Sequence, residues 1–414
     1  MDSPLIKNID LFLNDKPSVF ALREKAKNTL ETIGFPTLKT EAWKYTDIRP
    51  IIKSDLDINT EELHCEHDCD HHQKENSPFI EVRFCKGKLH IEDYDLPQGL
   101  SITPLPLALY ENEYKKYLFN SFEIEKHPFA ALNGMYLEQG ICILVEKNAH
   151  IKKPISIRYN QKNCAGFQIH IHNMIILEKD TQLELLEDFS GIDNETYFSN
   201  IVNEIYLKNS ASLYHYKIQK ESKTAYHIAL NAVKQQENSQ YKQFYLSNGA
   251  KISRQETYIN LEHSHSKAEI YTAYKAKKDC LTDITTNINH LMQETDSNQY
   301  AKAVLEKDST AVFQGKIHIA PYAVKTSGHQ LHKALYIDES ASLNCKPELE
   351  IYADDVKCSH GASSGEIDTE QLFYLLSRGI DKETALNMLT QAHLEEIIEL
   401  IPNTNIKDLF LFSK

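Results

Sequence analysis

The 414-residue sequence lacks the features that mark several large classes of protein. It has no run of about 18 consecutive apolar residues, the length that a membrane-spanning helix needs, and its first residues lack a basic start followed by an apolar stretch. Basic residues are fewer than acidic ones: 45 Lys and Arg against 59 Asp and Glu give a formal net charge of −14. Such a surface repels phosphate groups, so neither nucleic acid nor a membrane is expected as a partner. The sequence therefore predicts a soluble, cytoplasmic protein.

Two further absences limit the chemistry. The eight cysteines show no dense spacing of the kind found in disulfide-rich domains, which predicts reduced thiols. No G-x-x-x-x-G-K-[ST] motif occurs, so we do not expect the chain to use ATP itself. Any energy input would have to come from a partner.

An amphipathic helix is predicted over residues 18–33. Its apolar residues are spaced three, four, four and three apart, at Val19, Leu22, Ala26, Leu30 and Ile33. Gly34 and Pro36 should end this helix, because the first suits a left-handed C-cap and the second cannot continue it. Trp43, the only tryptophan, follows at once. We expect its ring to pack this N-terminal arm onto the next domain.

From about residue 140 to residue 362 the sequence repeats an aliphatic residue, a short polar turn and an alternating strand. The repeat spacing is 30 or 32 residues in its clearest parts, and the units begin at Val145, Leu177, Leu207, Leu261, Leu305 and Ile337, with Val233 in a weaker position. A period of this length, made of strands with almost no helical pattern, is typical of a solenoid such as a parallel β-helix. The alternative is an antiparallel sandwich or barrel, which short alternating strands also fit.

The repeat ends where the sequence changes from strand to helix. Alternation over residues 348–353 predicts the last strand, and a polar turn with Cys358 and His360 should follow it. Asp368 suits the N-cap of a helix over residues 369–378, and Asp381 that of a second helix. These helices are more apolar than packing on one another needs, so a partner surface is expected.

Cys358 and His360 are the sharpest candidates for chemistry. One residue separates them, which places both side chains on the same side of an extended backbone. A thiolate and an imidazole are both good iron ligands. Taken alone, however, the two residues fit better with an exposed turn that binds nothing.

Two stretches resemble the SufB/SufD family of iron–sulfur cluster assembly proteins. They are residues 346–362, KPELEIYADDVKCSHGA, followed by a helix with FYLLSRGI, and residues 34–46, GFPTLKTEAWKYT. The length fits the shorter, SufD branch of the family. The resemblance implies a mainly β fold: a right-handed parallel β-helix core at 126–365, an N-terminal helical arm and connecting region at 1–125, and a C-terminal helical domain at 366–414.

The resemblance also implies a function, that of a non-enzymatic scaffold subunit. The chain would pair with a SufB-like paralogue near His360 and Cys358, and a transient iron–sulfur cluster would be shared there, with none held stably by this chain alone. His360 is the favoured ligand and Cys358 an auxiliary one that binds iron or carries sulfur. A SufC-like ATPase would bind the C-terminal helices, with contacts predicted at Leu372, Phe373, Leu376 and Arg378. In isolation, open strand edges predict a homodimer.

Two rival readings come from other motifs. Residues 61–72, EELHCEHDCDHH, place Cys65 and Cys69 among four histidines, so the alternative function is a stand-alone metal-binding protein that uses the loop 64–72. Residues 361–365 match G-x-S-x-G, with Asp381 and His393 following in the order of a serine hydrolase. A hydrolase function is disfavoured, because a nucleophile elbow needs alternating strands and helices and the preceding residues show strands only. The pairs His170 with His172 and His263 with His265 are predicted to be solvated or coil-facing strand residues.

Overall fold

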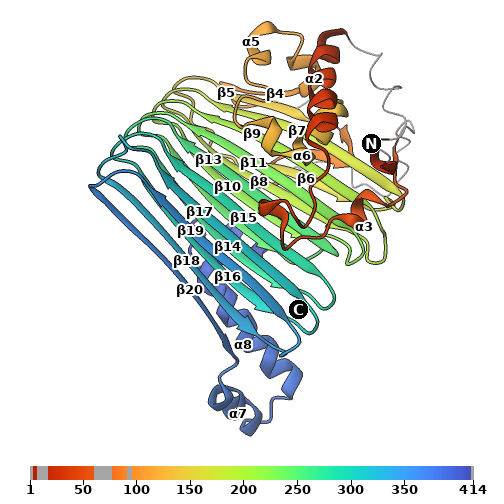
Figure 1. The fold of residues 1–414 in the computed structure, drawn as a ribbon, viewed down its shortest axis with the longest axis vertical. Helices are drawn as coiled ribbons and strands as arrows, with labels where there is room; N and C mark the ends of the chain where they lie inside the picture. The colour runs from red at the N-terminus through yellow and green to blue at the C-terminus, as the bar shows by residue number, and fades with distance from the viewer. Residues whose placement is uncertain (1–2, 7–16, 60–76, 91–95, 412–414) are drawn as a thin grey trace.

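A computed structural model describes residues 3–6, 17–59, 77–90 and 96–411. Its centre is a stack of coils, each built from one strand of sheet A and one strand of sheet B (Figure 1). From β5 to β20 the chain alternates between the two sheets, so these sixteen strands, two per coil, form eight coils. Neighbouring strands within this stack are parallel. The predicted β-solenoid is therefore confirmed, and the antiparallel sandwich or barrel is wrong.

The two sheets have ten strands each. In spatial order, sheet A contains β19 (Ser342–Ile351), β17 (Thr310–Ile319), β15 (Leu281–His290), β13 (Ile252–Leu261), β11 (Tyr226–Gln235), β9 (Phe198–Leu207), β7 (Phe167–Leu177), β5 (Ile141–Val145) and β4 (Leu100–Pro104), with β1 (Asp57–Ile58) beside β7. Sheet B contains β20 (Val356–Glu366), β18 (Thr326–Tyr336), β16 (Asp296–Leu305), β14 (Lys267–Ala276), β12 (Gln240–Ser247), β10 (Ser212–Lys220), β8 (Gln182–Gly191), β6 (Ile155–Gln161), β2 (Ile80–Cys85) and β3 (Lys88–His90).

The register shows how the repeat is built. Leu177 pairs with Val145 on one side and Leu207 on the other, as the period predicts, and the series continues through Gln235 to Leu261. The position assigned to Val233 is wrong, because Gln235 occupies it. Leu305 does not continue the series either, since it lies in sheet B and pairs with Tyr336. Each coil has two strands and two polar turns of similar composition, so the same pattern fits either sheet.

Left-handed residues shape the polar turns. Asn148, Asp180, Ser210 and Asn238 occupy equivalent turns of successive coils, with φ of 64°, 56°, 60° and 57°. The backbone N–H of each donates to a carbonyl in the next coil. Asn and Asp tolerate this conformation better than other non-glycine residues, which explains their recurrence in the sequence.

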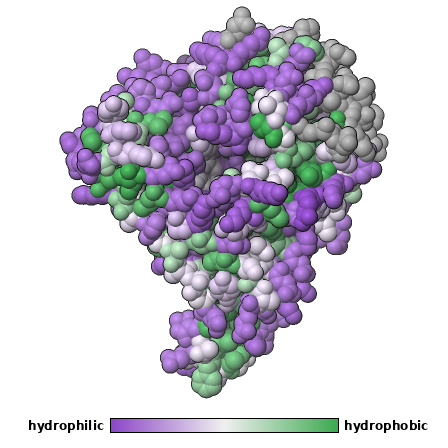
Figure 2. All heavy atoms as spheres, in the orientation of Figure 1, coloured by the Kyte–Doolittle hydropathy of each residue, from purple (hydrophilic) through white to green (hydrophobic). Residues whose placement is uncertain are grey.

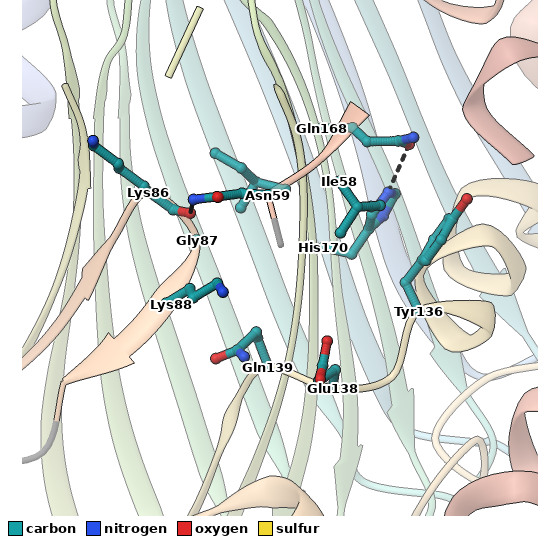
Figure 3. A pocket seen from close by; sticks show the side chains of 11 residues that line it. Ile58, Asn59, Lys86, Gly87, Lys88, Tyr136, Glu138, Gln139, Gln168 and His170 are labelled. Carbon is teal, nitrogen blue, oxygen red and sulfur yellow. Dashed lines mark hydrogen bonds between the residues drawn. The ribbon is translucent and has the colours of Figure 1, made fainter. Parts of the chain in front are cut away.

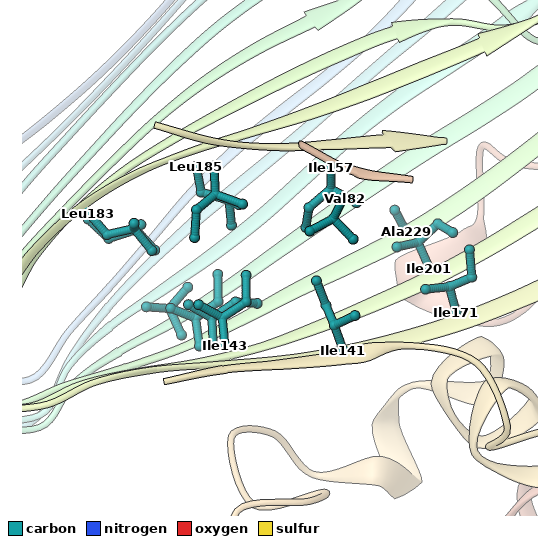
Figure 4. Packing of buried hydrophobic residues seen from close by; sticks show 14 of the residues in the cluster. Val82, Ile141, Ile143, Ile157, Ile171, Leu183, Leu185, Ile201 and Ala229 are labelled. Carbon is teal, nitrogen blue, oxygen red and sulfur yellow. The ribbon is translucent and has the colours of Figure 1, made fainter. Parts of the chain in front are cut away.

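Alternate side chains of both sheets fill the space between them. Toward the N-terminal end this lumen is apolar, with Ile143 and Ile171 of sheet A facing Ile157 and Leu185 of sheet B (Figure 4). Further along, polar side chains such as Lys217 enter the lumen without exposure to solvent. The stack therefore has a continuous core of mixed polarity.

Helices cover sheet A near the N-terminal coils. They are η1 (Pro4–Ile6), α2 (Pro17–Ile33), η2 (Glu41–Trp43), α3 (Arg49–Ile52), α4 (Leu105–Ala108), α5 (Asn112–Lys115), η3 (Ile124–Lys126) and α6 (Pro128–Met135). The first long helix and its end are as predicted: Gly34 has φ of 70°, and its N–H donates to the Leu30 carbonyl. Trp43 is 3% exposed and its ring lies 5.3 Å from that of Phe129, centroid to centroid. Its predicted role as an anchor is confirmed.

A second group of helices follows the last coil. It comprises α7 (Thr369–Ser377), α8 (Lys382–Ile398), α9 (Thr404–Lys407) and η4 (Asp408–Phe410). α8 and η4 lie against the outer face of sheet B, where Leu394 and Phe410 join a cluster with Tyr216 and Phe244. α7 has no buried residue and forms the narrow tip of the molecule (Figure 1). No helix within the described ranges is both long and apolar enough to cross a membrane.

Candidate functional site

The candidate site lies on β20, the outermost strand of sheet B. β20 pairs with β18 along one edge, and no described strand pairs with its other edge. β19 occupies the same outermost position in sheet A. The last coil, β19 with β20, is therefore open to solvent on the side away from the stack, and we call this side the open end.

Here the structure corrects one prediction. Residues 348–351 belong to β19, and the polar turn that follows it is 352–355. Cys358 and His360, predicted to lie in a turn, are in β20, and this strand rather than the segment 348–353 is the last. Glycine and serine are poor strand formers, so the segment from Cys358 to Gly365 resembles a loop in sequence. Pairing with β18 over all eleven residues keeps it extended.

Both candidate ligands continue columns of inward-facing positions. Cys358 is in register with Gly328, which is buried in β18. His360 is in register with Gln330, which is 3% exposed, and Gln330 in turn with Gln299 of β16. Because side chains two apart share a face of a strand, Cys358 and His360 both face the lumen side of the open end. The predicted placement on one face is confirmed.

The two ligands differ in environment. Cys358 is half-buried and, like Leu349 and Val356, packs against the edge of an apolar cluster. Burial raises the pKa of its thiol, and the backbone N–H of Gly328 partly opposes that shift by hydrogen bonding. The thiol is thus protonated near neutral pH and would release its proton on binding a metal. His360 is exposed, and its ring forms no hydrogen bond or ion pair with any residue that the structure describes. It is free to bind something outside this chain.

Cys345, a third thiol in the last coil, lies on β19 and pairs in register with Phe313. Burial raises the pKa of its thiol to about 11. Within the described ranges, no three or more His, Cys, Asp or Glu side chains come together as a metal site. Cys358 and His360 therefore supply two candidate ligands at most.

The predicted partner-binding residues of α7 are accessible. Phe373 is 71% exposed and Leu376 38% exposed, and Leu372 is half-buried. Arg378 is exposed and its guanidinium lies 5.2 Å from the centroid of the Tyr374 ring. Apolar side chains at this tip are also seen in the space-filling view (Figure 2). Behind α7, a groove of about 780 Å³ separates it from the turn after β18; it is lined in part by Ile337, Ala341, Ile367, Leu372 and Leu386.

The rival motifs fare differently. The Cys/His segment 61–72 lies outside the described residues, so metal binding there stays a prediction. Ser363 of the G-x-S-x-G match lies inside β20, where a nucleophile elbow would need a sharp turn from strand to helix. Asp381 instead caps α8, where its carboxylate accepts from the N–H of Thr384. The hydrolase reading is wrong.

The paired histidines also need correction. His170 and His172 are buried between sheet A and the helices over it, neither solvated nor in the lumen. Nε2 of His172 lies 3.1 Å from Oε1 of Glu204. His263 and His265 lie in the turn between β13 and β14 rather than on a strand. Their spacing of two resembles a strand, but the left-handed φ of 60° at His265 breaks it.

A small pocket was not anticipated from the sequence. It lies near the start of the solenoid and is lined in part by Asn59, Lys86, Lys88, Gln139 and His170 (Figure 3). Its volume is about 40 Å³, enough for water but not for a substrate. Burial lowers the pKa of His170 to about 3, so its ring is neutral. The other polar groups in its lining include Lys86, Lys88 and Glu138, but the space between them is too small for a substrate.

Buried charge inside the lumen was also missed. Nε2 of His215 lies 2.9 Å from Oε2 of Glu187, and Nζ of Lys217 lies 3.0 Å from Nε2 of His227. Burial lowers the pKa of Lys217 to about 8. The signal in the sequence is that polar residues occupy alternate positions of β10, whose other positions pack under the C-terminal helices.

Comparisons with known proteins agree with this architecture. Residues 157–393 match the family model described as SUF system FeS cluster assembly, SufBD core domain, and residues 8–157 match the SufBD protein N-terminal region. The chain is 29% identical over 401 residues to the chloroplastic protein ABCI7 of Arabidopsis thaliana, covering 94% of this chain and 83% of that protein. It is 26% identical over 400 residues to the iron-sulfur cluster assembly protein SufD of Escherichia coli, covering 91% and 88% of the two chains.

Proposed function

The chain belongs to the SufBD family of iron–sulfur cluster assembly proteins, and from this we propose that it is a non-enzymatic scaffold subunit. In this role it pairs with a SufB-like paralogue through the open end and binds a SufC-like ATPase through α7. The iron–sulfur cluster is its cargo, shared with the paralogue and not held by this chain alone.

One observation carries the proposal: Cys358 and His360 face the same way on the outermost strand of an incomplete stack. An unpaired strand edge is a template for pairing with another chain. A chain that pairs there would come next to an exposed imidazole and a half-buried thiol. The open end thus combines a means of assembly with two groups that bind iron.

The number of ligands explains why a partner is needed. Protein-bound iron–sulfur clusters usually have four ligands, most often thiolates. Cys358 and His360 can supply two, so the others must come from across the interface. His360 acts as the main ligand because its ring has no partner among the described residues, whereas binding at Cys358 must first overcome its raised thiol pKa.

Exposure supports α7 as the ATPase contact. A helix with no buried residue that shows Phe373 and Leu376 to solvent is suited to packing against another protein. Replacing Leu372 and Phe373 together with Glu should weaken ATPase binding in a pull-down and leave the solenoid folded by circular dichroism. Unchanged binding would place the ATPase elsewhere.

The decisive experiment is anaerobic cluster assembly on the complex co-expressed with SufB-like and SufC-like partners. His360→Ala should reduce the cluster absorbance, while size exclusion shows an intact complex. His329→Ala is the control: His329 is an exposed histidine on the outer face of the neighbouring strand β18, and its loss removes a hydrogen bond between its Nδ1 and Oγ of Ser359 but no candidate ligand. Equal cluster yield in wild type and His360→Ala would leave the protein with an architectural role only.

The Cys358→Ser variant separates the two roles open to the thiol. If Cys358 binds iron in the finished cluster, the variant should change the spectrum of the cluster. If it carries sulfur, the variant should slow assembly and leave the final spectrum unchanged. When no partner is present, we propose that the open end pairs with a second copy of the chain.

A further inference from the structure

One corner of the solenoid changes composition along the stack. This corner contains the turns that lead from sheet A to sheet B. After β7, β9, β11 and β13 these turns show charged or polar side chains to solvent, among them Lys179, Ser210, Glu237 and His263. Such tips are what a solvated turn normally presents.

The three turns nearest the open end also expose polar side chains, such as Gln293, Lys325 and Asp354, but they expose large apolar or aromatic side chains as well. The turn after β15 exposes Leu291 and Met292, each at 39%, the turn after β17 exposes Tyr322 at 84%, and the turn after β19 exposes Tyr352 at 61%. We call these four residues the apolar corner. In Figure 1 these turns lie at one edge of the molecule, apart from the tip formed by α7.

The fold does not require these side chains. The turns of the earlier coils make the same backbone bonds to the next coil with polar tips. Single exposed apolar residues are common, but these lie on consecutive coils and so form one patch. Tyrosine is also enriched among the residues that dominate protein interfaces. We therefore expect another protein to cover this patch.

We infer that the apolar corner is a docking surface for the β-solenoid chain that pairs with the open end; this rests on the proposed function. The patch spans the last three coils, so it lies within roughly 15 Å of the open edge at a strand spacing of about 4.8 Å. A chain that adds strands to β19 and β20 extends both sheets, and one of its own corners then follows directly on Tyr352. Coils farther away keep polar tips because the partner does not reach them.

The ATPase is the other candidate, and its proposed site is too far away. The apolar corner adjoins the start of β20 at Val356, whereas α7 follows its end at Glu366. Eleven extended residues separate the two by about 33 Å. The corner is thus continuous with the strand edge and not with α7.

The test is the affinity of this chain for the purified SufB-like paralogue, measured by titration calorimetry. Tyr322→Asp should weaken binding about tenfold or more, as expected for a tyrosine at an interface. His263→Asp is the control, because it places the same charge on the same corner two coils farther from the open end than Tyr322. It should change the affinity less than twofold. Tyr322 is almost fully exposed, so folding should be unaffected, and a thermal melt verifies this.

The outcomes separate this inference from the function on which it rests. If the wild-type chain forms no complex with the paralogue, the proposed pairing itself fails. If the complex forms and Tyr322→Asp binds as tightly as wild type, only the role of the apolar corner is overturned. If Tyr322→Asp weakens binding of the ATPase and leaves the affinity for the paralogue unchanged, the corner contacts the ATPase instead, and the inference is also overturned.

Discussion

Nζ of Lys346 lies 2.5 Å from Oε1 of Glu41, although 305 positions separate the two residues in the sequence. Lys346 is on β19 in the last coil, and Glu41 is in the N-terminal arm. The same short arm contacts three earlier strands of sheet A. Arg254 of β13 lies under the Trp43 ring, and Asp283 of β15 and Gln314 of β17 form hydrogen bonds with the arm. The segment therefore crosses four coils and ends at the open end.

Among the residues of this arm, Trp43 should contribute most to its docking on sheet A. Trp43→Ala should lower the free energy of unfolding by about 3–5 kcal/mol, because it removes a large buried ring. Glu41→Ala should leave the unfolding midpoint unchanged, since the carboxylate is exposed to solvent. Urea denaturation followed by circular dichroism measures both. A Trp43→Ala protein as stable as wild type would mean that the arm is not docked in solution.

Acid should destabilise the protein through its buried histidines. Burial lowers the pKa of His170 and His290 to about 3 and that of His332 to about 4. The unfolded chain takes up these protons near pH 6.5, whereas the folded chain resists them, so stability is lost as the pH falls from 6.5 toward 4. His332→Gln should lower by about one the number of protons taken up on unfolding, and so reduce the slope of stability against pH. Urea titrations at intervals of pH between 4 and 7 measure the slope, and an unchanged slope would contradict the assignment.

The N-cap of α7 should decide whether this helix forms. The carboxylate of Asp368 accepts from the N–H groups of Glu370 and Gln371, at 2.8 and 3.3 Å. Because α7 buries no residue, Asp368→Ala should destabilise it by about 1 kcal/mol, and hydrogen exchange over 369–377 should speed up. Asp368→Asn should retain slow exchange, since Asn caps equally well. Fast exchange in both variants would point to charge rather than capping.

The left-handed turns should tolerate few residue types. Ser210 has φ of 60° and is exposed. Ser210→Val should cost about 1–2 kcal/mol because a β-branched side chain is strained in this conformation, whereas Ser210→Gly should cost nothing. Ser212→Val, two residues later in β10, is the control and should be neutral or favourable, because valine suits a strand. Thermal melts of the three variants compare them directly, and equal effects of the two valines would refute the turn assignment.

Much of the fold could be predicted from residue patterns. The period of the repeat, the helix ending at Gly34 and the caps at Asp368 and Asp381 each have a local cause, and each is found in the structure. The pattern could not say which sheet Leu305 belongs to, because both strands of a coil alternate in the same way. It also missed β20, since that strand is held by pairing with β18 rather than by its own propensity.

The candidate site was only partly predictable. The spacing of Cys358 and His360 predicts a shared face, and the structure agrees. That this face looks into an unfinished lumen depends on which strand is outermost, a property of the whole stack. The charged groups around Lys217 were missed for a similar reason, because their burial requires a second sheet that the strand itself does not reveal.

The open end also has a thermodynamic consequence. In a stack where each coil is stabilised by its neighbours, the terminal coil has one neighbour instead of two. A chain that docks there takes the place of a ninth coil, so part of the folding free energy of β19 and β20 belongs to the complex. By mass action, the order of the strand that carries Cys358 and His360 then rises with the concentration of the partner. Association with the partner and ordering of the strand that carries the two candidate ligands are then one coupled equilibrium.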